Sequence, residues 1–315
     1  MSSKTGILLI NLGTPNAPTI SAVRQYLKEF LLDPDVITLP ALLRYLLVYG
    51  FILPCRSKQS AHAYQKIWTK EGSPLFVYSR LLELALAKEL NEDFSVSLGM
   101  RYGNPSIETA VDFLIKNNCR KIIIFPLFPQ FSNATSGSAL KKVFHILKNT
   151  SIQTKVISNF YNLNFYIDSY VEIIQSFLNK NEIDFILFSY HGLPEKDDAK
   201  SYRQQCVETT VCMAQKLKLS DHYFATTFQS RLGKMRWIQP YTDLYLPKLI
   251  HHHVKKLAVV CPSFVADCLE TLEEINIRLR MQWMRLGGES FQLITCLNDH
   301  PAWINNLKTF ITTLK

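Results

Sequence analysis

Short apolar runs alternate with longer amphipathic stretches along the whole chain. The runs are rich in β-branched and aromatic residues, and they lie at residues 6–10, 94–99, 120–125, 153–158, 183–189, 223–228, 256–261 and 290–294. Runs of this length, bounded by loops and separated by leucine and alanine at helical spacing, are typical of buried strands. Strands and helices in regular alternation predict an α/β fold with parallel sheets.

The alternation occurs twice, with a seam near residues 155–165. It therefore predicts two similar doubly wound, Rossmann-like domains with parallel four-stranded sheets, over residues 1–160 and 161–315. We expect the ligand cleft to lie between them. A C-terminal helix at residues 300–315 is assigned to the second domain, and packing back on the first is the alternative.

Two helix starts follow from local capping signals. Ser73 is expected to cap a helix that has Pro74 at its first position, and Asn104 with Pro105 repeats this arrangement before the next helical stretch. Proline suits the first helical position because its fixed backbone angle is helical and its missing N–H is not needed there.

Residues 36–55, VITLPALLRYLLVYGFILPC, are almost wholly apolar. A membrane-spanning helix here would place Arg44 near its middle, at a cost of about 2.5–3.5 kcal/mol, and Pro40 would break its first turns. We therefore expect no span. Two interpretations stay open: a helix in the core, and an exposed lip that binds a flat apolar ligand or rests on lipid.

The composition is that of folded domains, with 47% hydrophobic and 19% charged residues. Seven scattered cysteines without a C-x-x-C pair favour reduced thiols in the cytoplasm, and no export signal is recognisable. The net charge of +9 favours an anionic partner. Nucleic acid is disfavoured, because the basic residues are dispersed and no aromatic residues are interleaved with them.

A histidine follows the first strand of the second half, in SYHGLP. Ligands of doubly wound sheets bind beyond the carboxyl ends of the strands, and the loops there carry no glycine-rich phosphate motif. His191 would be held over the cleft by the Gly-Leu-Pro bend. The alternative is a histidine whose ring nitrogens bond the backbone of its own turn.

A row of carboxylates follows the strand at residues 256–261. Asp267, Glu270 and Glu274 have helical spacing and would share one face, which Glu273 extends. The alternative is a solvated helix face. One imidazole facing such a row suits either transient binding of a divalent metal through nitrogen and oxygen or proton transfer with histidine as the base. A site without thiolates would hold the metal loosely, which matters if the metal is the substrate.

Aromatic and basic residues near the strand ends would suit a large, flat, carboxylated ligand. The aromatic candidates for the lining are Tyr102, Phe128, Phe131 and Trp237. The arginines that could pair with its carboxylates are Arg24, Arg44, Arg56, Arg101 and Arg231. For each aromatic side chain taken singly, packing in the core is the alternative.

Seven separated motifs occur in one order along the chain. They are NLGTP, VRQYLKEFLLDPDVI, RYGNPS, PQFS, SYHGLP, FQSRLGKMRWIQPYTD and CPSFVADCLETLEEI. In these motifs, and over essentially its whole length, the chain resembles the ferrochelatase family, in its proteobacterial form. The resemblance implies insertion of ferrous iron into protoporphyrin IX to form protohaem, the last step of haem biosynthesis.

The resemblance also implies roles for particular residues. His191 and Glu270 match the family's metal ligands and proton acceptors, and the carboxylates of Glu273, Glu274 and Asp267 would relay protons or iron. A second set would bind the porphyrin: Arg101, Tyr102, Trp237, Arg44, Arg56 and Phe131. Residues 36–55 correspond to the lip of the porphyrin mouth.

Further expectations follow from the resemblance. Iron is a substrate and no prosthetic group is expected, nor an iron–sulfur cluster, since only Cys296 follows Cys268. Peripheral membrane contact through the lip and transient contact with the preceding enzyme of the haem pathway are expected. Cys268 replaces a histidine found in many relatives, and Arg278 ends the acidic row early. The alternatives are a coproporphyrin III ferrochelatase and a porphyrin or haem carrier without turnover.

Overall fold

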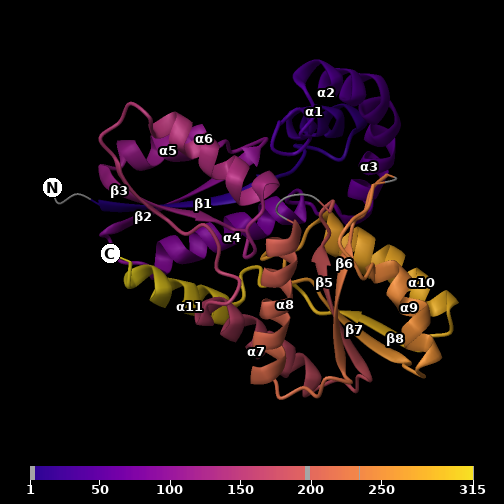
Figure 1. The fold of residues 1–315 in the computed structure, drawn as a ribbon. Coiled ribbons are helices and arrows are strands. Elements are labelled where there is room, and N and C mark those ends of the chain that lie inside the picture. The colour runs from indigo at the N-terminus through magenta and orange to yellow at the C-terminus, as the bar shows by residue number, and fades with distance from the viewer. Residues whose placement is uncertain (1–3, 196–198, 234, 315) are drawn as a thin grey trace. The chain divides into compact units, whose positions relative to one another are not determined.

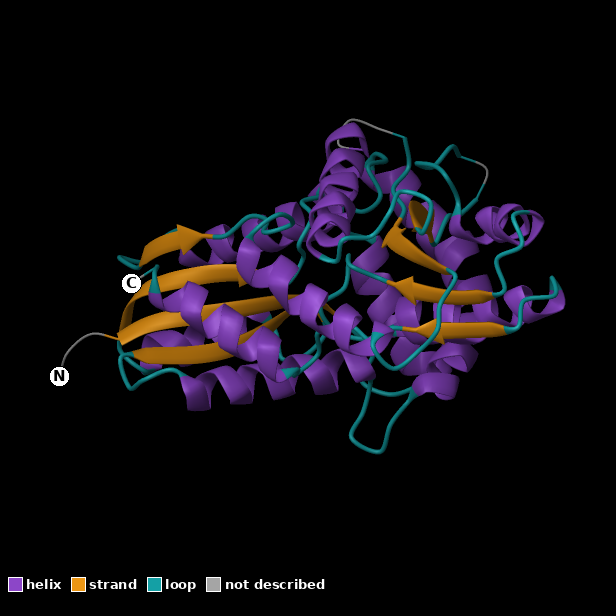
Figure 2. Ribbon diagram, turned by 90° about the horizontal axis from the view of Figure 1, so that it is seen from below, coloured by secondary structure: helices purple, strands orange, loops and turns teal. Residues whose placement is uncertain are grey.

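The computed structural model describes residues 4–195, 199–233 and 235–314 (Figure 1). Lys234, in one of the motifs above, and Lys315, at the end of the predicted last helix, lie outside the described residues. The chain folds into two compact units that meet in sequence between Asn159 and Phe160. Each unit contains one four-stranded sheet whose strands all run in one direction (Figure 2).

The first sheet has the strand order β2-β1-β3-β4. Its strands are β1 (Lys4–Gly13), β2 (Phe94–Tyr102), β3 (Cys119–Pro126) and β4 (Gln153–Val156). The central strand β1 pairs in parallel with β2 and β3, with Ile7 opposite Val96 on one side and Ile123 on the other. Such strands are buried on both faces, which explains why they read as continuous apolar runs in the sequence.

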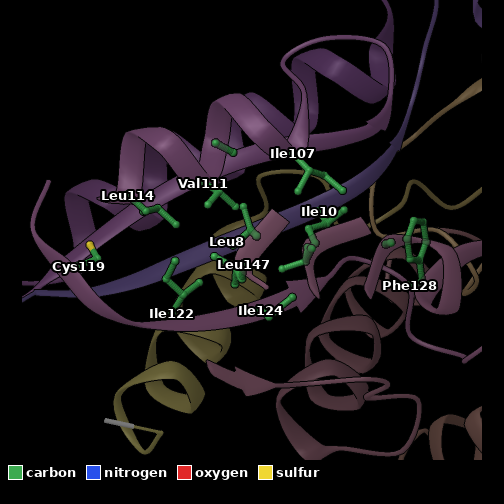
Figure 3. Packing of buried hydrophobic residues seen from close by; sticks show 13 residues of the cluster. Leu8, Ile10, Ile107, Val111, Leu114, Cys119, Ile122, Ile124, Phe128 and Leu147 are labelled. Atoms are coloured by element: carbon green, nitrogen blue, oxygen red, sulfur yellow. The ribbon is translucent and has the colours of Figure 1, made fainter. Parts of the chain in front are cut away.

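Helices cover both faces of the first sheet. They are α1 (Ile20–Leu31), α4 (Pro74–Glu89), α5 (Ile107–Lys116), the π-helical turn η2 (Asn133–Gly137) and α6 (Ser138–Leu147). Figure 1 shows α5 and α6 on one side of the strands and α4 on the other. The core beneath α5 and α6 is formed by Leu8, Ile10, Ile122, Ile124, Val111 and their neighbours (Figure 3).

The two predicted helix starts fare differently. Helix α4 does begin at Pro74 with Ser73 before it, but the Ser73 hydroxyl makes no capping bond and instead accepts a hydrogen bond of 2.7 Å from Thr14 Oγ1. Helix α5 begins at Ile107, so the start predicted at Pro105 is wrong. Its cap is Ser106, whose hydroxyl accepts from the Thr109 N–H.

Residues 36–55 form an exposed apolar surface. They comprise α2 (Ala41–Leu47), the π-helical turn η1 (Val48–Ile52) and the start of α3 (Leu53–Ile67). Val48 and Leu53 are buried against Leu31, whereas Leu42 is 72% and Phe51 71% exposed. Of the two interpretations left open, the exposed lip is therefore the one observed. In the described part of the chain, no helix combines the length and hydropathy needed to cross a membrane.

The second sheet has the strand order β6-β5-β7-β8. Its strands are β5 (Phe185–His191), β6 (Phe224–Gln229), β7 (Lys256–Val260) and β8 (Ser290–Leu293). The helices of this unit are α7 (Asn164–Leu178), α8 (Ala199–Lys216), α9 (Thr242–His251), the π-helix η3 (Glu270–Leu279), α10 (Arg280–Arg285) and α11 (Pro301–Thr312). Helix α11 packs on α7. Figure 1 shows α7 and α8 on one side of this sheet and α9 and α10 on the other.

Strand alternation decides which way His191 faces. Phe185 and Leu187 lie in the core beneath α9, η3 and α10, and the Ser189 hydroxyl contacts Thr242 of α9 at 2.9 Å. Side chains two residues apart on a strand share a face. His191 is therefore on the face of the sheet that the π-helix covers.

A glycine in the NLGTP motif allows the close approach of two strands. Gly13 has φ +112°, and a Cβ atom there would lie 1.7 Å from the Tyr102 carbonyl oxygen. We expect Gly13→Ala to lower the free energy of unfolding by about 3 kcal/mol or more, because strain and overlap add. Urea unfolding measures it. Gly50→Ala is the control: a Cβ there meets nothing within 4 Å, so an equal loss in both variants would contradict this account.

Candidate active site

His191 is the last residue of β5 and is held by its backbone. Its N–H donates to Ser263 Oγ at 3.1 Å, and its carbonyl oxygen accepts from the Tyr202 hydroxyl at 2.9 Å. Its ring nitrogen Nδ1 lies 2.6 Å from the Gly192 carbonyl oxygen. A carbonyl oxygen can only accept, so Nδ1 carries the proton, and Nε2 of the neutral ring keeps its lone pair. Within the described residues, Nε2 has no hydrogen-bond partner.

One part of the structural alternative for His191 is observed, since one ring nitrogen bonds the backbone of its own turn. The other nitrogen keeps the lone pair that a base or a metal ligand requires, and the functional interpretation stays a prediction. The sequence could not decide between the two interpretations, because each concerns a different nitrogen.

Buried tyrosines hold the loop that anchors His191. Tyr166 and Tyr170 of α7 donate to the carbonyl oxygens of Pro262 and Phe264 at 2.5 and 2.6 Å. Between these lies Ser263, which the Tyr202 hydroxyl also contacts at 3.1 Å. Burial raises the pKa of Tyr202 well above its ordinary value, so its hydroxyl stays protonated as a donor. The position of His191 therefore depends on hydrogen bonds that the motifs did not reveal.

The predicted acidic row lies on a π-helix rather than an α-helix. The π-helix η3 begins at Glu270, so Asp267 precedes it. The Asp267 carboxylate is buried, accepting at 2.8 Å from both Thr271 Oγ1 and Asn298 Nδ2. A π-helix takes more residues per turn than an α-helix, so α-helical spacing no longer defines a face. One shared acidic face over residues 267–274 is therefore not observed.

The carboxylates of η3 have different surroundings. Glu273 is buried and paired with Arg278, whose Nε donates to Oε2 at 2.7 Å. Glu270 is partly exposed, and among the described residues no nitrogen or oxygen donor holds its carboxylate. Burial raises the pKa of the neighbouring Cys268 thiol well above its ordinary value, and the Glu270 carboxylate raises it further. The Cys268 thiol therefore stays protonated beside the Glu270 carboxylate.

Glu274 is fixed by the residue that follows β6. Ser230 donates its N–H to Oε1 at 2.8 Å and its hydroxyl to Oε2 at 2.6 Å. Burial raises the Glu274 pKa above its ordinary value and the nearby Glu270 adds to this, whereas Ser230, Arg278 and His191 oppose it.

The neighbouring Gln229 ties the strand ends to the π-helix. Its carbonyl oxygen accepts from the Gly192 N–H at 2.9 Å, and its side-chain amide donates to the Glu270 carbonyl oxygen at 3.1 Å. Its amide oxygen accepts from Ser189 Oγ at 2.8 Å. Gln229 and Ser230 are the second and third residues of the motif FQSRLGKMRWIQPYTD, but no residue pattern assigned them a role.

Trp237 packs beside the His191 turn. Its side chain is buried, and its indole N–H donates to the Leu232 carbonyl oxygen at 2.9 Å. A Cβ added at Gly192 would lie 3.4 Å from its ring and 2.7 Å from the Gln229 carbonyl oxygen. The glycine of SYHGLP is therefore required by the close packing of this turn.

In the first unit, a buried carboxylate gathers two of the predicted porphyrin-binding residues. Asp33 Oδ2 accepts from Tyr102 at 2.8 Å, from Ser138 at 2.6 Å and from the Arg101 guanidinium at 2.5 Å. Tyr102 is fully buried, whereas Arg101 keeps some exposed surface. Burial raises the Asp33 pKa, but the hydrogen bonds from Ser138, the Asp35 N–H and Tyr102, together with the Arg101 charge, hold it below its ordinary value.

The other three predicted porphyrin-binding residues have separate environments. Arg44 is buried and its Nη1 donates to the carbonyl oxygens of Ile37 and Leu39 at 3.2 and 2.8 Å, which closes the loop before α2. Arg56 and Phe131 are both partly exposed. Arg44 therefore has an observed structural role within the lip.

The described residues contain no group of three or more histidine, cysteine, aspartate or glutamate side chains arranged to hold a metal ion. The His191 imidazole and the Glu270 carboxylate supply nitrogen and oxygen atoms of the kind that divalent first-row metals accept as ligands. Chemically, this unit offers an imidazole lone pair and a partly exposed carboxylate.

Comparisons with known proteins identify the family. The sequence model of the ferrochelatase family matches residues 4–314. The chain is 50% identical to the ferrochelatase of Coxiella burnetii (strain Dugway 5J108-111), over 96% of this chain and 92% of that protein. It is 46% identical to the ferrochelatase of Legionella pneumophila subsp. pneumophila (strain Philadelphia 1), over 98% of each chain. The chain belongs to the ferrochelatase family.

As a ferrochelatase it is an enzyme, a lyase that acts on a porphyrin and ferrous iron, so the predicted family and reaction class are confirmed. The sirohydrochlorin chelatase SirB from Bacillus subtilis subspecies spizizenii, solved in complex with cobalt, superposes with a TM-score of 0.57 at 10% identity, over 96% of this chain and 92% of SirB. That likeness concerns the fold alone, and the predicted α/β fold with two parallel sheets is confirmed.

The Asp33 cluster predicts a pH-dependent contribution to stability. Because its folded pKa is lowered, Asp33 stabilises the fold above its unfolded pKa of about 3.9, and the contribution is lost as the pH falls through the folded value. We expect Asp33→Asn to cost about 3 kcal/mol of unfolding free energy at neutral pH, with the difference from wild type shrinking below about pH 4.

The control for this prediction is Asp35→Asn. Asp35 pairs with Lys141, whose side chain is 68% exposed, so its loss should cost less than about 1 kcal/mol. Unfolding in urea at several pH values measures both. A cost for Asp33→Asn that does not change between neutral and acidic pH would contradict the ionic role of the carboxylate.

Proposed function

We propose that the protein inserts ferrous iron into protoporphyrin IX, with His191 and Glu270 as the metal ligands and proton acceptors. The observation that carries the proposal is the state of His191: Nδ1 is bound to a carbonyl oxygen, so the lone pair of Nε2 is available on the face of the sheet that bears η3. Glu270, at the start of η3, supplies a carboxylate that no described nitrogen or oxygen donor holds.

The reaction requires two protons to leave and one ion to enter. Each of two pyrrole N–H bonds breaks, the electron pairs stay on nitrogen, and Fe²⁺ forms bonds to the ring nitrogens without a change in its oxidation state. His191 Nε2 can accept one of these pyrrole protons or bind the iron. The carboxylate of Glu270 can take the second proton or pair with the incoming cation.

The remaining carboxylates fit the proposed relay to different degrees. Glu274 lies on the same π-helix as Glu270, in a largely buried position. Glu273 is occupied by Arg278, and Asp267 by Thr271 and Asn298. We therefore place the relay through Glu270 and Glu274, and give Glu273 and Asp267 a supporting role around the helix.

Among the predicted porphyrin-binding residues, Arg101, Arg56 and Phe131 keep exposed surface that a ligand could contact. Tyr102 and Trp237 are buried, and in this proposal each supports the exposed residues around it without contacting the porphyrin. Arg44 acts through the loop before α2. No resident cofactor or iron–sulfur cluster is part of the proposal, and contact with the preceding enzyme of the pathway would deliver the porphyrin.

Anaerobic insertion of Fe²⁺ or Zn²⁺ into protoporphyrin IX, followed by its visible spectrum, tests the proposal. We expect turnover by the wild type, and a loss of about 10²- to 10⁴-fold in kcat for His191→Ala and for Glu270→Ala, because each removes a group that handles protons or metal. Porphyrin binding, measured by quenching of protein fluorescence, should persist in both variants.

The matched control is His251→Ala, which removes an exposed histidine at the end of α9. Its kcat should equal that of the wild type. A wild type that binds protoporphyrin but inserts no metal would support the carrier alternative instead. Faster insertion into coproporphyrin III than into protoporphyrin IX, compared as kcat/KM, would support the coproporphyrin alternative.

We also propose that the enzyme is cytoplasmic and makes peripheral contact with an anionic membrane through the lip. Its exposed apolar side chains are Leu39, Leu42, Leu43, Tyr45, Leu46, Tyr49 and Phe51. Lys28 lies 5.6 Å from the Tyr49 ring, so positive charge borders the patch. Contiguous exposed apolar side chains bordered by basic ones suit the interface of an anionic bilayer.

Cosedimentation with phosphatidylglycerol-containing vesicles tests this contact. We expect binding by the wild type and loss of most binding in the triple variant Leu42→Ser, Leu46→Ser, Phe51→Ser. The control replaces three apolar side chains that are exposed elsewhere in the same unit, Leu84, Phe113 and Phe144. An equal loss of vesicle binding in both triple variants, or no binding by the wild type, would contradict membrane contact through the lip.

A further inference from the structure

Ser230 has a backbone conformation that serines rarely adopt. It follows β6 directly and has φ +66°, in the left-handed region that is unfavourable for residues with a Cβ atom. In this conformation its N–H and its hydroxyl both reach the Glu274 carboxylate, at 2.8 Å to Oε1 and 2.6 Å to Oε2. One residue thus binds both oxygens of one carboxylate.

Gln229, the residue before Ser230, bonds the π-helix η3 one turn earlier. The Gln229 amide donates to the Glu270 carbonyl oxygen at 3.1 Å, and the Gln229 carbonyl oxygen accepts from Gly192 next to His191. Gln229 and Ser230, at the end of β6 and directly after it, therefore form hydrogen bonds with two successive turns of η3, at Glu270 and Glu274. Arg278 Nη2 lies 3.9 Å from Glu274 Oε2.

We propose that Ser230 is a positioning residue that keeps residues 270–279 in the π-helical form and thereby places Glu270. The i→i+5 bonding of a π-helix is rare, because α-helical bonding is available to the same residues. A return to α-helical bonding would turn residue 274 about the helix axis relative to residue 270 and pull its carboxylate away from Ser230. The two hydrogen bonds to that carboxylate oppose this change.

The expected effect of Ser230 on turnover rests on the proposed function, whereas its expected effect on the conformation of η3 does not. Ser230→Gly removes the hydroxyl while keeping the N–H and favouring the left-handed backbone. Lys218→Gly is the matched control: it relieves a positive φ of 54° in the same unit, at an exposed residue that follows α8. The two variants differ in whether a contact with η3 is lost.

Two measurements test the inference. Hydrogen exchange followed by mass spectrometry should show exchange in residues 270–279 about tenfold faster in Ser230→Gly and unchanged in Lys218→Gly. In the insertion assay, Ser230→Gly should lower kcat by about 10- to 100-fold with KM for porphyrin unchanged, because Glu270 is misplaced rather than removed. Ser230→Asn, which tolerates the left-handed backbone and carries a donor amide, should recover part of kcat.

A double-mutant cycle completes the test. Ser230→Gly should cause no further loss in a Glu274→Ala background, since the contact is already absent there. Wild-type exchange in Ser230→Gly, an unchanged kcat, or full additivity with Glu274→Ala would overturn the inference. If the wild type inserts no metal, the proposed function fails, and the exchange measurement still decides the role of Ser230.

Discussion

The pairing of the last residues of β5 and β6 is the constraint on which the site depends. His191 lies opposite Gln229 in the ladder, and the next N–H, that of Gly192, donates to the Gln229 carbonyl oxygen at 2.9 Å. The Gln229 side chain is buried and reaches both Ser189 and the first residue of η3. A buried amide with these partners cannot shift without leaving polar groups unpaired. Gln229 therefore links the backbone positions of His191 and Glu270 to each other.

The polar groups at the strand ends of the two units are used differently. In the first unit Asp33 binds Arg101, Tyr102 and Ser138, so a buried carboxylate is satisfied and stabilises the unit. In the second unit the anchoring bonds go to the backbone of His191, and the lone pair of Nε2 has no described partner. Fully paired groups support a structure, whereas reactive groups that a rigid frame leaves open are available for chemistry.

Much of this could be predicted from the sequence, for identifiable reasons. The central strands β1 and β5 are buried almost throughout, so continuous apolar runs predicted them. The edge strand β4 is largely exposed, and its β-branched residues predicted it instead. His191 stood out because a strand ended in a histidine and a bend. The π-helix could not be predicted, since the spacing of Glu270, Glu273 and Glu274 fits an α-helix equally well. Nor could the hydrogen bonds of Ser230 and Tyr202, whose partners Glu274 and His191 are distant along the chain and are brought close only by the fold.

The tautomer of His191 is the most direct test of the proposed chemistry, because both proposed roles of the ring require a lone pair on Nε2. Nitrogen-15 NMR of the chain labelled at its histidine rings, at alkaline pH where the imidazole is neutral, reports which nitrogen carries the proton. A His191→Asn chain assigns the signal. We predict a protonated Nδ1 and an unprotonated Nε2 for His191. A proton on Nε2 would contradict this, since that nitrogen could then neither accept a pyrrole proton nor bind iron.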